Sequence, residues 1–414
     1  MPGAGGRVLL VAPLASYRIV PYLEAARALG VEPVVAADGE PLAAGHGIHV
    51  RLEEPARAAR AILDAVAQAP PAAVVATDDA TVEVAARVAE ALGLPHNPPE
   101  AARRARRKDL ARQAQAAAGL PVPWFRRLPL AELAAGRIPD EVPYPCVIKP
   151  LALNASRGVI RADDARGLAA AARRVAAIVG GLADAEERGH ALVEAYLPGE
   201  EIAVEALLRA GRPRILAVFD KPDPLEGPFF EETLYVTPSR HDPALLARVE
   251  RRLAEVCAAC GLREGPVHAE FRLHDGEAWV LEVAARTIGG ECARLLHMGT
   301  GVALEALVIA AALGRAPQVR PFAGAGGVLM LPVPGPGVLR RVEGVLAARR
   351  VPGVEAVEIG LREGYRLVPL PEGGSYLGFV FARGPDPETV EAALREARAR
   401  LRVVVAPELA VSVG

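Results

Sequence analysis

The first hundred residues alternate short, continuously apolar runs with amphipathic stretches. Apolar runs without polar positions are typical of strands buried on both faces of a parallel sheet, and the amphipathic stretches between them are typical of helices that cover it. We expect strands at residues 7–12, 34–37 and 72–77, and helices from Ser16 to Gly30, near 55–68, and from Asp78 or Asp79 to Leu92. The pattern therefore predicts an open α/β sheet with helices on both faces.

This first sheet lacks the GxGxxG fingerprint of a dinucleotide site. The segment after the first strand reads Pro-Leu-Ala-Ser-Tyr-Arg, so the domain is Rossmann-like in shape only. Ligands of open parallel sheets bind beyond the carboxyl ends of the strands. We therefore expect ligand contacts near Ser16, Tyr17, Arg18, Thr77 and Asp78.

Beyond a proline-marked boundary near residue 97, strands follow one another mostly through short turns. Such a pattern predicts an antiparallel sheet with flanking helices, which is an α+β unit. We expect helices at 99–118, from Asp163 or Asp164, and at 243–260, and strands at 146–149, 159–161, 192–196, 203–208, 214–219, 267–273 and 278–283.

A second break at 317–321 precedes a third α+β unit. We expect its strands near 327–333, 354–361, 365–370, 376–383 and 401–405, and a helix at 387–400. The chain is accordingly divided into a Rossmann-like domain (1–97), a central domain (98–316) and a C-terminal domain (317–414). The central domain has a small subdomain, about 98–191, and a large one, about 192–316.

Composition narrows the class of protein. The net charge is −2 and the pI about 6.5, which gives no reason to expect a nucleic-acid or membrane partner. The N-terminal apolar run is too short for a signal peptide or a membrane span. Four cysteines, with a lone CxxC at Cys257 and Cys260 inside a helical stretch, predict reduced, buried thiols in a cytoplasmic protein. A homodimer is compatible with the sequence.

The chain has 48 basic residues, and only Lys108, Lys149 and Lys221 are lysines. A composition that uses arginine for generic positive charge favours lysine where a slim ammonium is needed, for example between phosphate oxygens. Lys149 ends an apolar strand and is followed by a loop of small residues that ends at Gly158. Such a loop lets backbone N–H groups approach phosphates. It is not a Walker P-loop, because GxxxxGK[ST] is absent.

Two acids, Glu270 and Glu282, lie on neighbouring apolar strands. An unpaired buried carboxylate is costly, whereas Mg²⁺ binds through a few carboxylates together with nucleotide phosphates. The alternative is that both side chains simply face solvent. His268 shares the face of Glu270, and a structural hydrogen bond is as good an explanation for it as a role in the site.

The strand at 192–196 runs into a turn at Pro198-Gly199. The order of lysines, small-residue loop, this strand and turn, and paired acids resembles the ATP-grasp superfamily. The resemblance implies a Rossmann-like domain, a two-part ATP-binding domain and a C-terminal lid domain. By this resemblance, Lys108 and Lys149 would bind the ATP phosphates, and Ser156, Arg157 and Gly158 would form the loop that covers them. Glu194, Tyr196 and Leu197 would line the adenine edge, and Glu201 would bind the ribose. Glu270 and Glu282 would hold Mg²⁺, which Mn²⁺ could replace.

The segment from Glu282 to Gly290, EVAARTIGG, is similar to the L-amino-acid ligase branch, as is the stretch 376–383. In that branch an arginine at the position of Arg286 faces the reacting carbonyl, and glycines at Gly289 and Gly290 shape the amino-acid pocket. The segment 219–235 would supply substrate contacts from Lys221, Glu232 and Tyr235, with Glu232 beside the substrate amino group.

Two positions depart from the family pattern. Ala284 stands where many members have a metal-binding asparagine, which puts a second ion in doubt. Tyr235 stands where the branch has a histidine, which implies a different amino-acid preference. The resemblance implies a carboxylate–amine ligase that consumes ATP and acts on small-molecule carboxylate and amine substrates through an acyl phosphate. The alternatives are a carboxylase or purine-pathway chemistry on the same fold, or a non-catalytic ATP-binding regulator.

Overall fold

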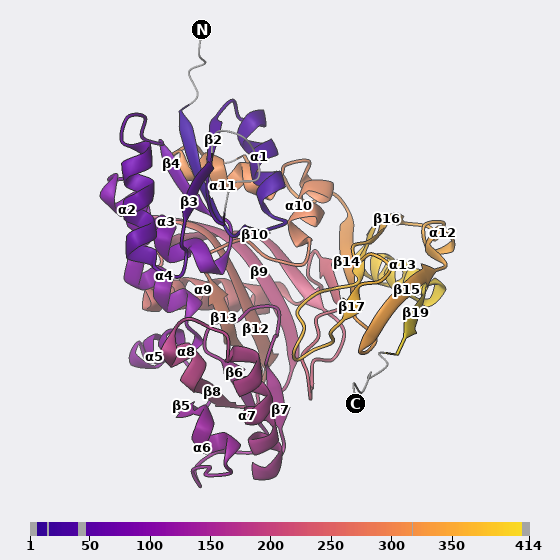
Figure 1. Cartoon of the computed structure of the whole chain (residues 1–414). Helices are drawn as coiled ribbons and strands as arrows, with labels where there is room; N and C mark the ends of the chain where they lie inside the picture. The colour runs from indigo at the N-terminus through magenta and orange to yellow at the C-terminus, as the bar shows by residue number, and fades with distance from the viewer. Residues whose placement is uncertain (1–5, 15, 40–46, 317, 408–414) are drawn as a thin grey trace, which may run out of the picture.

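The computed structural model describes residues 6–14, 16–39, 47–316 and 318–407. Figure 1 shows four parts: an N-terminal sheet at the top, a small sheet at the bottom, a large sheet in the centre, and C-terminal strands at the right. The mixed α/β and α+β architecture confirms the predicted fold class. The domain boundaries proposed from the sequence remain predictions, and Pro317, at one of them, lies outside the described residues.

The N-terminal sheet is parallel, with strand order β3-β2-β1-β4. Its strands are β1 (Arg7–Ala12), β2 (Glu32–Asp38), β3 (Gly47–Val50) and β4 (Ala73–Ala76). The helices are α1 (Ile19–Ala28), α2 (Pro55–Val66) and α3 (Val82–Ala91), which follows a short 3-10 turn, η1 (Asp79–Thr81). Five of the six β1 side chains are buried, as the apolar run predicts for a strand covered on both faces.

The small sheet is antiparallel, with strand order β5-β8-β6-β7. It comprises β5 (Phe125–Pro129), β6 (Cys146–Pro150), β7 (Ile160–Ala162) and β8 (His190–Ala195). Around it lie α6 (Leu130–Ala134), α7 (Ala165–Val179) and α8 (Ala185–Gly189). The apolar face of α7 packs on β6 and β7, so the loop between these two strands is left at the edge of the sheet that faces the large one.

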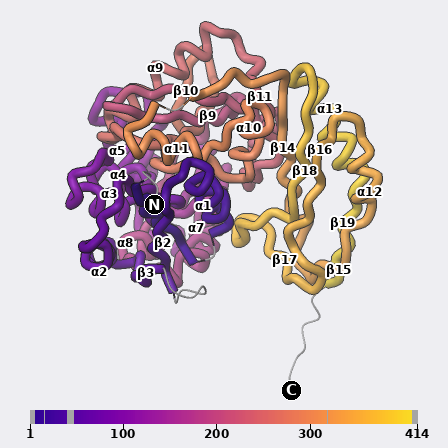
Figure 2. Tube along the Cα trace, turned by 90° about the horizontal axis from the view of Figure 1, so that it is seen from above, coloured from indigo at the N-terminus to yellow at the C-terminus, as the bar shows by residue number. Residues whose placement is uncertain are grey.

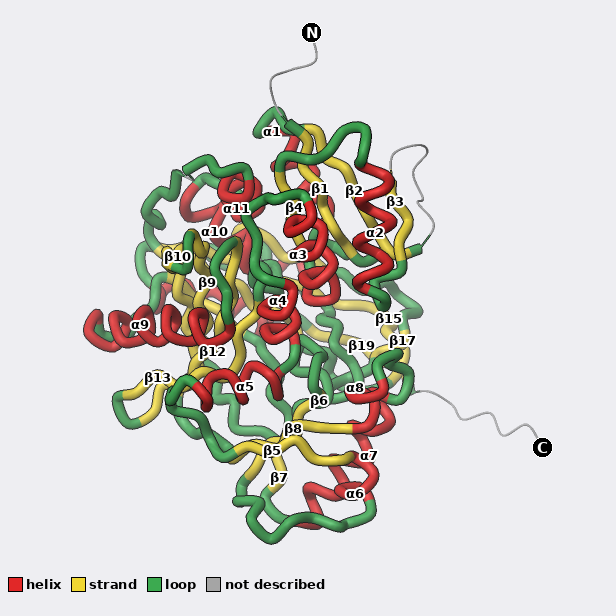
Figure 3. Tube along the Cα trace, turned by 90° about the vertical axis from the view of Figure 1, so that its left-hand side faces the viewer, coloured by secondary structure: helices red, strands yellow, loops and turns green. Residues whose placement is uncertain are grey.

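One predicted helix is wrong. The expected single helix at 99–118 is two helices, α4 (Pro99–Arg106) and α5 (Lys108–Ala117), separated at Arg107, whose backbone is extended. Arg107 is 1% exposed, and two of its nitrogens donate to Asp109 at 2.9 Å each. The backbone N–H of Lys108 donates to Leu151. The local bonds to Asp109 and the long-range bond to Leu151 stabilise the break, so Lys108 begins a new helix. Figure 3 shows α4 and α5 as separate helices.

The large sheet has the strand order β13-β12-β9-β10-β11-β14-β18-β16. Its strands are β9 (Glu200–Arg209), β10 (Arg212–Lys221), β11 (Leu234–Thr237), β12 (Gly265–His274), β13 (Glu277–Ala284), β14 (Ala325–Leu331), β16 (Val354–Ile359) and β18 (Gly378–Gly384). Thus three strands from the C-terminal region extend the sheet of the central region (Figure 2).

The remaining elements cover this sheet or flank it. α9 (Pro243–Cys260) packs against β10 and β13, and α13 (Pro387–Arg400) packs against β14 and β18. A separate three-stranded sheet contains β15 (Gly337–Glu343), β17 (Arg366–Leu367) and β19 (Arg402–Ala406), with α12 (Val345–Ala348) beside it. β3, β5, β11 and β15 were not predicted, because strands without a clear alternation of apolar and polar positions give a weak signal.

Two helices, α10 (Cys292–Thr300) and α11 (Leu304–Ala312), connect β13 to the C-terminal strands. Among the described residues, no single helix has the length and hydropathy of a membrane span. α10 and α11 together have that length and hydropathy, but they are bent by 91° relative to each other. All four cysteines are buried and free, as predicted. Burial raises the pKa of Cys257 to about 12 and that of Cys260 to about 11, so the CxxC thiols are poorly reactive.

Candidate active site

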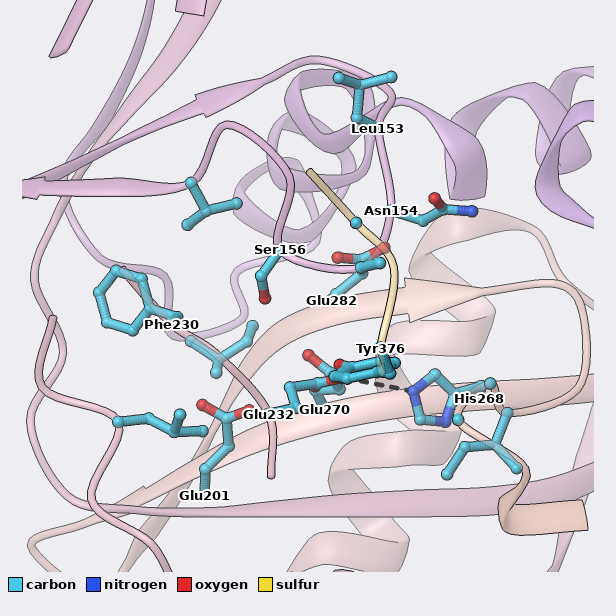
Figure 4. A pocket seen from close by; sticks show the side chains of 18 of the residues that line it. Leu153, Asn154, Ser156, Glu201, Phe230, Glu232, His268, Glu270, Glu282 and Tyr376 are labelled. Carbon is cyan, nitrogen blue, oxygen red and sulfur yellow. Dashed lines mark hydrogen bonds and ion pairs between the residues drawn. The ribbon is translucent and has the colours of Figure 1, made fainter. Parts of the chain in front are cut away.

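A cavity of about 970 Å³ lies where the N-terminal, small and large sheets meet. Its wall includes the segment after β1, the β6–β7 loop, the acidic strands of the large sheet and residues near 374–379. Figure 4 shows Ser156 on the loop pointing toward the carboxylates of the large sheet. Fourteen of the predicted site residues line it: Lys108, Lys149, Ser156, Glu194, Tyr196, Leu197, Glu201, Glu232, Tyr235, Glu270, Glu282, Arg286, Gly289 and Gly290.

Lys108 and Lys149 enter the cavity from different elements. Lys108 begins α5, and its Nζ lies 3.0 Å from Glu282 Oε2 and 2.8 Å from the carbonyl oxygen of Leu153. Lys149, near the end of β6, has its Nζ 2.5 Å from Glu194 Oε2. Glu194 is also bound by Arg112, four residues after Lys108 on the same helix face. The two ammonium groups are thereby fixed by carboxylates on β13 and β8.

Glu194 is a buried anchor of this arrangement. Burial alone would raise its pKa, but Arg112 and Lys149 outweigh burial and lower the pKa to about 2. Arg112 further donates to the carbonyl oxygens of Val280 and Leu281 on β13. Glu194 was predicted at the adenine edge; it lines the cavity, and its carboxylate is bound by Arg112 and Lys149. Arg112 was missed by the sequence reasoning, although its i+4 spacing from Lys108 was a usable signal.

Glu270 and Glu282 are directly opposite each other in the register of β12 and β13. Both line the cavity, which places two carboxylates on one wall near Lys108. Hard oxygen ligands of this kind are what Mg²⁺ prefers when it also binds phosphates. The donor set therefore fits a divalent ion held by Glu270 and Glu282. Ala284, opposite His268 on the same strands, supplies no such ligand.

Lys221, the last residue of β10, sits among three acids. Its Nζ lies 2.6 Å from Glu201, 2.5 Å from Glu232 and 3.1 Å from Glu270. One carboxylate oxygen from each of these three acids lies within 4.8 Å of the other two, close enough to bind one metal ion together. Burial would lower the pKa of Lys221, but the three carboxylates raise it well above its usual range. Burial raises the pKa of Glu232 to about 7 even with Lys221 beside it.

Arg286 follows β13 and reaches back to the N-terminal domain. Its Nε lies 2.7 Å from Asp79 Oδ2, and its Nη1 donates to the carbonyl oxygen of Thr287 at 3.0 Å. Burial would lower the pKa of Arg286, but Asp79 raises it, so the guanidinium stays charged. Among the described residues these contacts use two of the five guanidinium N–H groups, leaving donors for a ligand. Asp79 was missed as a site residue, because the contact spans 207 positions.

The loop after Arg286 is held from two sides. Arg18 donates to the carbonyl oxygens of Thr287 and Ile288 at 2.8 and 3.1 Å. Glu205, completely buried on β9, accepts from the backbone N–H of Ile288 at 3.0 Å. Gly290 has a positive φ of 61°, and Met330 occupies the space that a side chain would need. A glycine is therefore required at position 290 by the local geometry.

His268 lies between Glu270 and Glu205, the residue that binds the loop after Arg286. Its Nε2 lies 3.3 Å from Glu270 Oε1, and its Nδ1 lies 3.8 Å from Glu205 Oε2. Burial raises the pKa of Glu205 well above its usual range and lowers that of His268. Tyr235, also buried, places its ring 5.0 Å from Lys221 Nζ. Hydrogen bonds and ion pairs therefore connect most of the polar side chains at this end of the cavity.

The cavity is not lined by three of the predicted site residues, Lys221, Arg157 and Gly158. Arg157 donates through Nε to the carbonyl oxygen of Glu372, and the backbone N–H of Gly158 donates to the carbonyl oxygen of Pro371, each at 2.9 Å. Arg174 on α7 binds Glu372 through two bonds of 2.7 and 2.9 Å. The small sheet is thus fastened to the C-terminal segment. Further lining residues, which the sequence did not reveal, include Asn154, Phe230, Tyr376 and Phe379.

Comparison with known proteins agrees with this geometry. Residues 142–294 match the family model of the ATP-grasp domain, and residues 329–406 match the L-amino acid ligase C-terminal domain 2. The chain thus contains an ATP-grasp domain. As an ATP-grasp protein it is 26% identical to the L-amino acid ligase of Bacillus licheniformis, whose crystal structure superposes with a TM-score of 0.83 over 98% of this chain and 100% of that one.

Other ATP-grasp structures share the fold at lower identity. Carboxyaminoimidazole ribonucleotide synthase from Aspergillus clavatus is 17% identical, with a TM-score of 0.71 over 96% of this chain and 99% of that one. The uncharacterized protein y4rH of Sinorhizobium fredii is 26% identical over 319 residues, which are 75% of this chain. The match spans 63% of the length of that relative. This ATP-grasp ligase-family protein is thus structurally close to an L-amino acid ligase.

Proposed function

We propose that the protein is a Mg²⁺- and ATP-dependent carboxylate–amine ligase with an amino acid as one substrate. The observation that carries the proposal is the convergence of Lys108, Lys149, Glu270, Glu282 and Arg286 on one cavity. Cations for a triphosphate, two carboxylates for a divalent ion and a buried guanidinium are the groups that acyl activation requires. The likeness to an L-amino acid ligase supports an amino-acid substrate.

The proposed reaction has two steps. A substrate carboxylate oxygen attacks the γ-phosphorus of ATP, the bond to the bridging oxygen breaks, and ADP leaves with the formation of an acyl phosphate. An amine nitrogen then attacks the acyl carbon, inorganic phosphate leaves, and the nitrogen loses a proton as the amide forms. A bound Mg²⁺, held by Glu270 and Glu282, would neutralise phosphate charge.

The residues of the chain divide this work by position. Lys108 and Lys149 would bind phosphate oxygens, and Ser156 would cover them from the β6–β7 loop. Tyr196, Leu197 and Glu194 would border the adenine, and Glu201 the ribose. Arg286, oriented by Asp79, would stabilise the oxyanion formed when the amine adds to the acyl carbon.

The amino-acid end of the cavity would be formed by Glu232, Tyr235, Gly289 and Gly290. Glu232 would bind the substrate amino group, and Lys221, which also contacts Glu201 and Glu270, would keep the three acids in place. The tyrosine ring in place of the family's histidine supports a substrate side chain different from that of the relatives.

A phosphate-release screen over pairs of amino acids tests the proposal, with Glu282→Ala as the blank. The expected result is release of ADP and phosphate that requires one acid and one amine, and formation of a hydroxamate when hydroxylamine replaces the amine. Bicarbonate and formate serve as competing acceptors. Turnover with these alone would instead favour carboxylase or purine-pathway chemistry, and tight ATP binding without any turnover would favour a regulator.

A further inference from the structure

A second cavity, of about 240 Å³, lies behind Arg286. Ala285 lines this rear cavity, whereas the next residue, Arg286, lines the active site. Figures 1 and 2 place α11 between the N-terminal sheet and the large sheet, and α11 contacts both β4 and β9. The rear cavity is formed by α3, β4, the β9–β10 hairpin and α11, so it is separate in position from the ligase site.

The interior of the rear cavity is apolar. It is lined by Val82 and Ala85 of α3, Leu207 of β9, and Val308 and Ala311 of α11. These side chains carry no hydrogen-bonding atoms, so a polar group placed among them would lose its bonds to water without replacement. The space accordingly suits an aliphatic or aromatic body.

The rim is strongly basic. It carries four exposed arginines, Arg209, Arg212, Arg214 and Arg315. Arg209 and Arg212 are paired directly across the hairpin, whose two-residue turn has positive φ at both Ala210 and Gly211. Arg214, two residues further along β10, shares the face of Arg212. Three arginines of one hairpin therefore face the same opening.

The charge of three of these arginines, Arg209, Arg212 and Arg315, is not balanced by an acid in the described part of the chain. Glu264 is the single acid among the described residues that line the cavity, and its Oε1 accepts from the backbone N–H of Ala210 at 2.9 Å. Within the described part of the chain, Arg209, Arg212 and Arg315 form no ion pair. Like charges directly opposite on neighbouring strands are destabilising, so an anion at the opening would relieve the repulsion.

We propose that the rear cavity binds an amphiphilic organic anion, with a carboxylate or similar head held by the rim arginines and an apolar chain inserted between α3 and α11. A guanidinium fork matches a carboxylate with two parallel hydrogen bonds, which makes arginine suited to this contact. The proposal does not depend on the ligase reaction, since its residues are distinct from those of the active site.

Calorimetric titration of the full-length protein with octanoate tests the proposal, with octan-1-ol as the uncharged probe. Arg209→Ser/Arg212→Ser removes charge at the exposed hairpin, and Ala85→Phe fills the interior. Arg251→Ser, on the exposed face of α9 and away from the cavity, is the control for charge. Each titration is repeated with saturating ATP, and circular dichroism verifies the fold of each variant.

The expected result is saturable binding of one octanoate, unchanged by ATP or by Arg251→Ser, and weakened about tenfold or more by the arginine double variant and by Ala85→Phe. The proposal is overturned if octanoate gives no saturable heat, if octan-1-ol binds equally well, if ATP competes, or if Arg251→Ser weakens binding as much as the double variant. If Ala85→Phe does not fold, the double variant decides alone.

Discussion

Asp79 and Arg286, 207 positions apart, form an ion pair of 2.7 Å that joins the N-terminal sheet to the end of β13. The side chain of Asp79 is 13% exposed and that of Arg286 8%, so the pair is shielded from water. A shielded guanidinium with a fixed partner is pre-organised for charge that develops in a transition state. The N-terminal domain thereby contributes to the site without supplying a phosphate-binding fingerprint.

Replacing Asp79 should lower turnover more than substrate binding. We expect Asp79→Asn to reduce kcat about 10- to 100-fold, because small displacements of an oxyanion-stabilising group are costly. Steady-state ADP release measures the effect. Glu83→Gln, which breaks a surface ion pair with Arg87 on α3, is the matched control and should leave kcat unchanged. If the Asp79→Asn variant kept the wild-type kcat, Asp79 would not be needed to orient Arg286 for catalysis.

Lys149→Arg should disable ATP use although the charge is kept. Lys149 Nζ lies 2.5 Å from Glu194, which Arg112 already binds at 2.6 Å, so a broader guanidinium has no room there. We expect kcat/KM for ATP to fall on the order of 100-fold, comparable to the loss in Lys149→Gln. Initial rates over a range of ATP concentrations provide the measurement. Near-normal kcat/KM in the arginine variant would mean that charge alone suffices.

Ionised Glu194 should stabilise the folded protein at neutral pH, and this contribution should be lost in acid. Because its folded-state pKa is lowered to about 2, this stability is present above the ordinary glutamate pKa of about 4.5 and is lost as pH falls toward 2. Chemical unfolding of wild type and Glu194→Gln between pH 6 and 2 tests this. The difference in unfolding free energy should narrow by up to about 3 kcal/mol on acidification. A constant difference would contradict the assignment.

The bond between Arg174 and Glu372 should affect nucleotide affinity without affecting stability. Both side chains are more than 40% exposed, and exposed pairs contribute only about 0–1 kcal/mol to folding. We expect Arg174→Gln to raise the KM for ATP about 3- to 10-fold, because the phosphate-side loop loses part of its fastening. Arg173→Gln, its exposed neighbour that binds only the carbonyl oxygen of Ala134 among described residues, is the control. Equal KM values in the two variants would exclude a role for this contact.

The sequence was sufficient for the local parts of the structure. Apolar runs located most strands of the N-terminal and large sheets, and the rarity of lysine singled out Lys108 and Lys149, which both line the cavity. The break at Arg107 could not be predicted, because two of the contacts that stabilise it join residues far apart in the sequence: the ion pair with Glu186 and the hydrogen bond from the Lys108 N–H to Leu151. Likewise, no local pattern reveals that Asp79 meets Arg286. Contacts of this kind depend on how whole domains pack.

The same limit applies to Lys221. Its position in an acidic, proline-containing segment suggested a substrate contact, but the segment alone does not show that one ammonium contacts three acids from β9, β12 and the segment before β11. The strand order, in which β9 and β10 are neighbours and β12 lies beyond β9, brings them together. The three contacts of Lys221 thus follow from the strand order of the large sheet, which the local sequence does not reveal.

The uninterrupted large sheet determines which part of this molecule can open. Each strand of the large sheet, from β13 to β16, is hydrogen-bonded to its neighbour. Rotation of the C-terminal strands as a lid would therefore require one of these strand pairs to separate. Among the described residues, the four-stranded small sheet shares no strand pairing with the large sheet, and it is held at the C-terminal side by the contacts of Arg157, Gly158 and Arg174. The small sheet is therefore the part that can shift without breaking the strand pairing of the large sheet, and such a shift would break these three contacts at its C-terminal side.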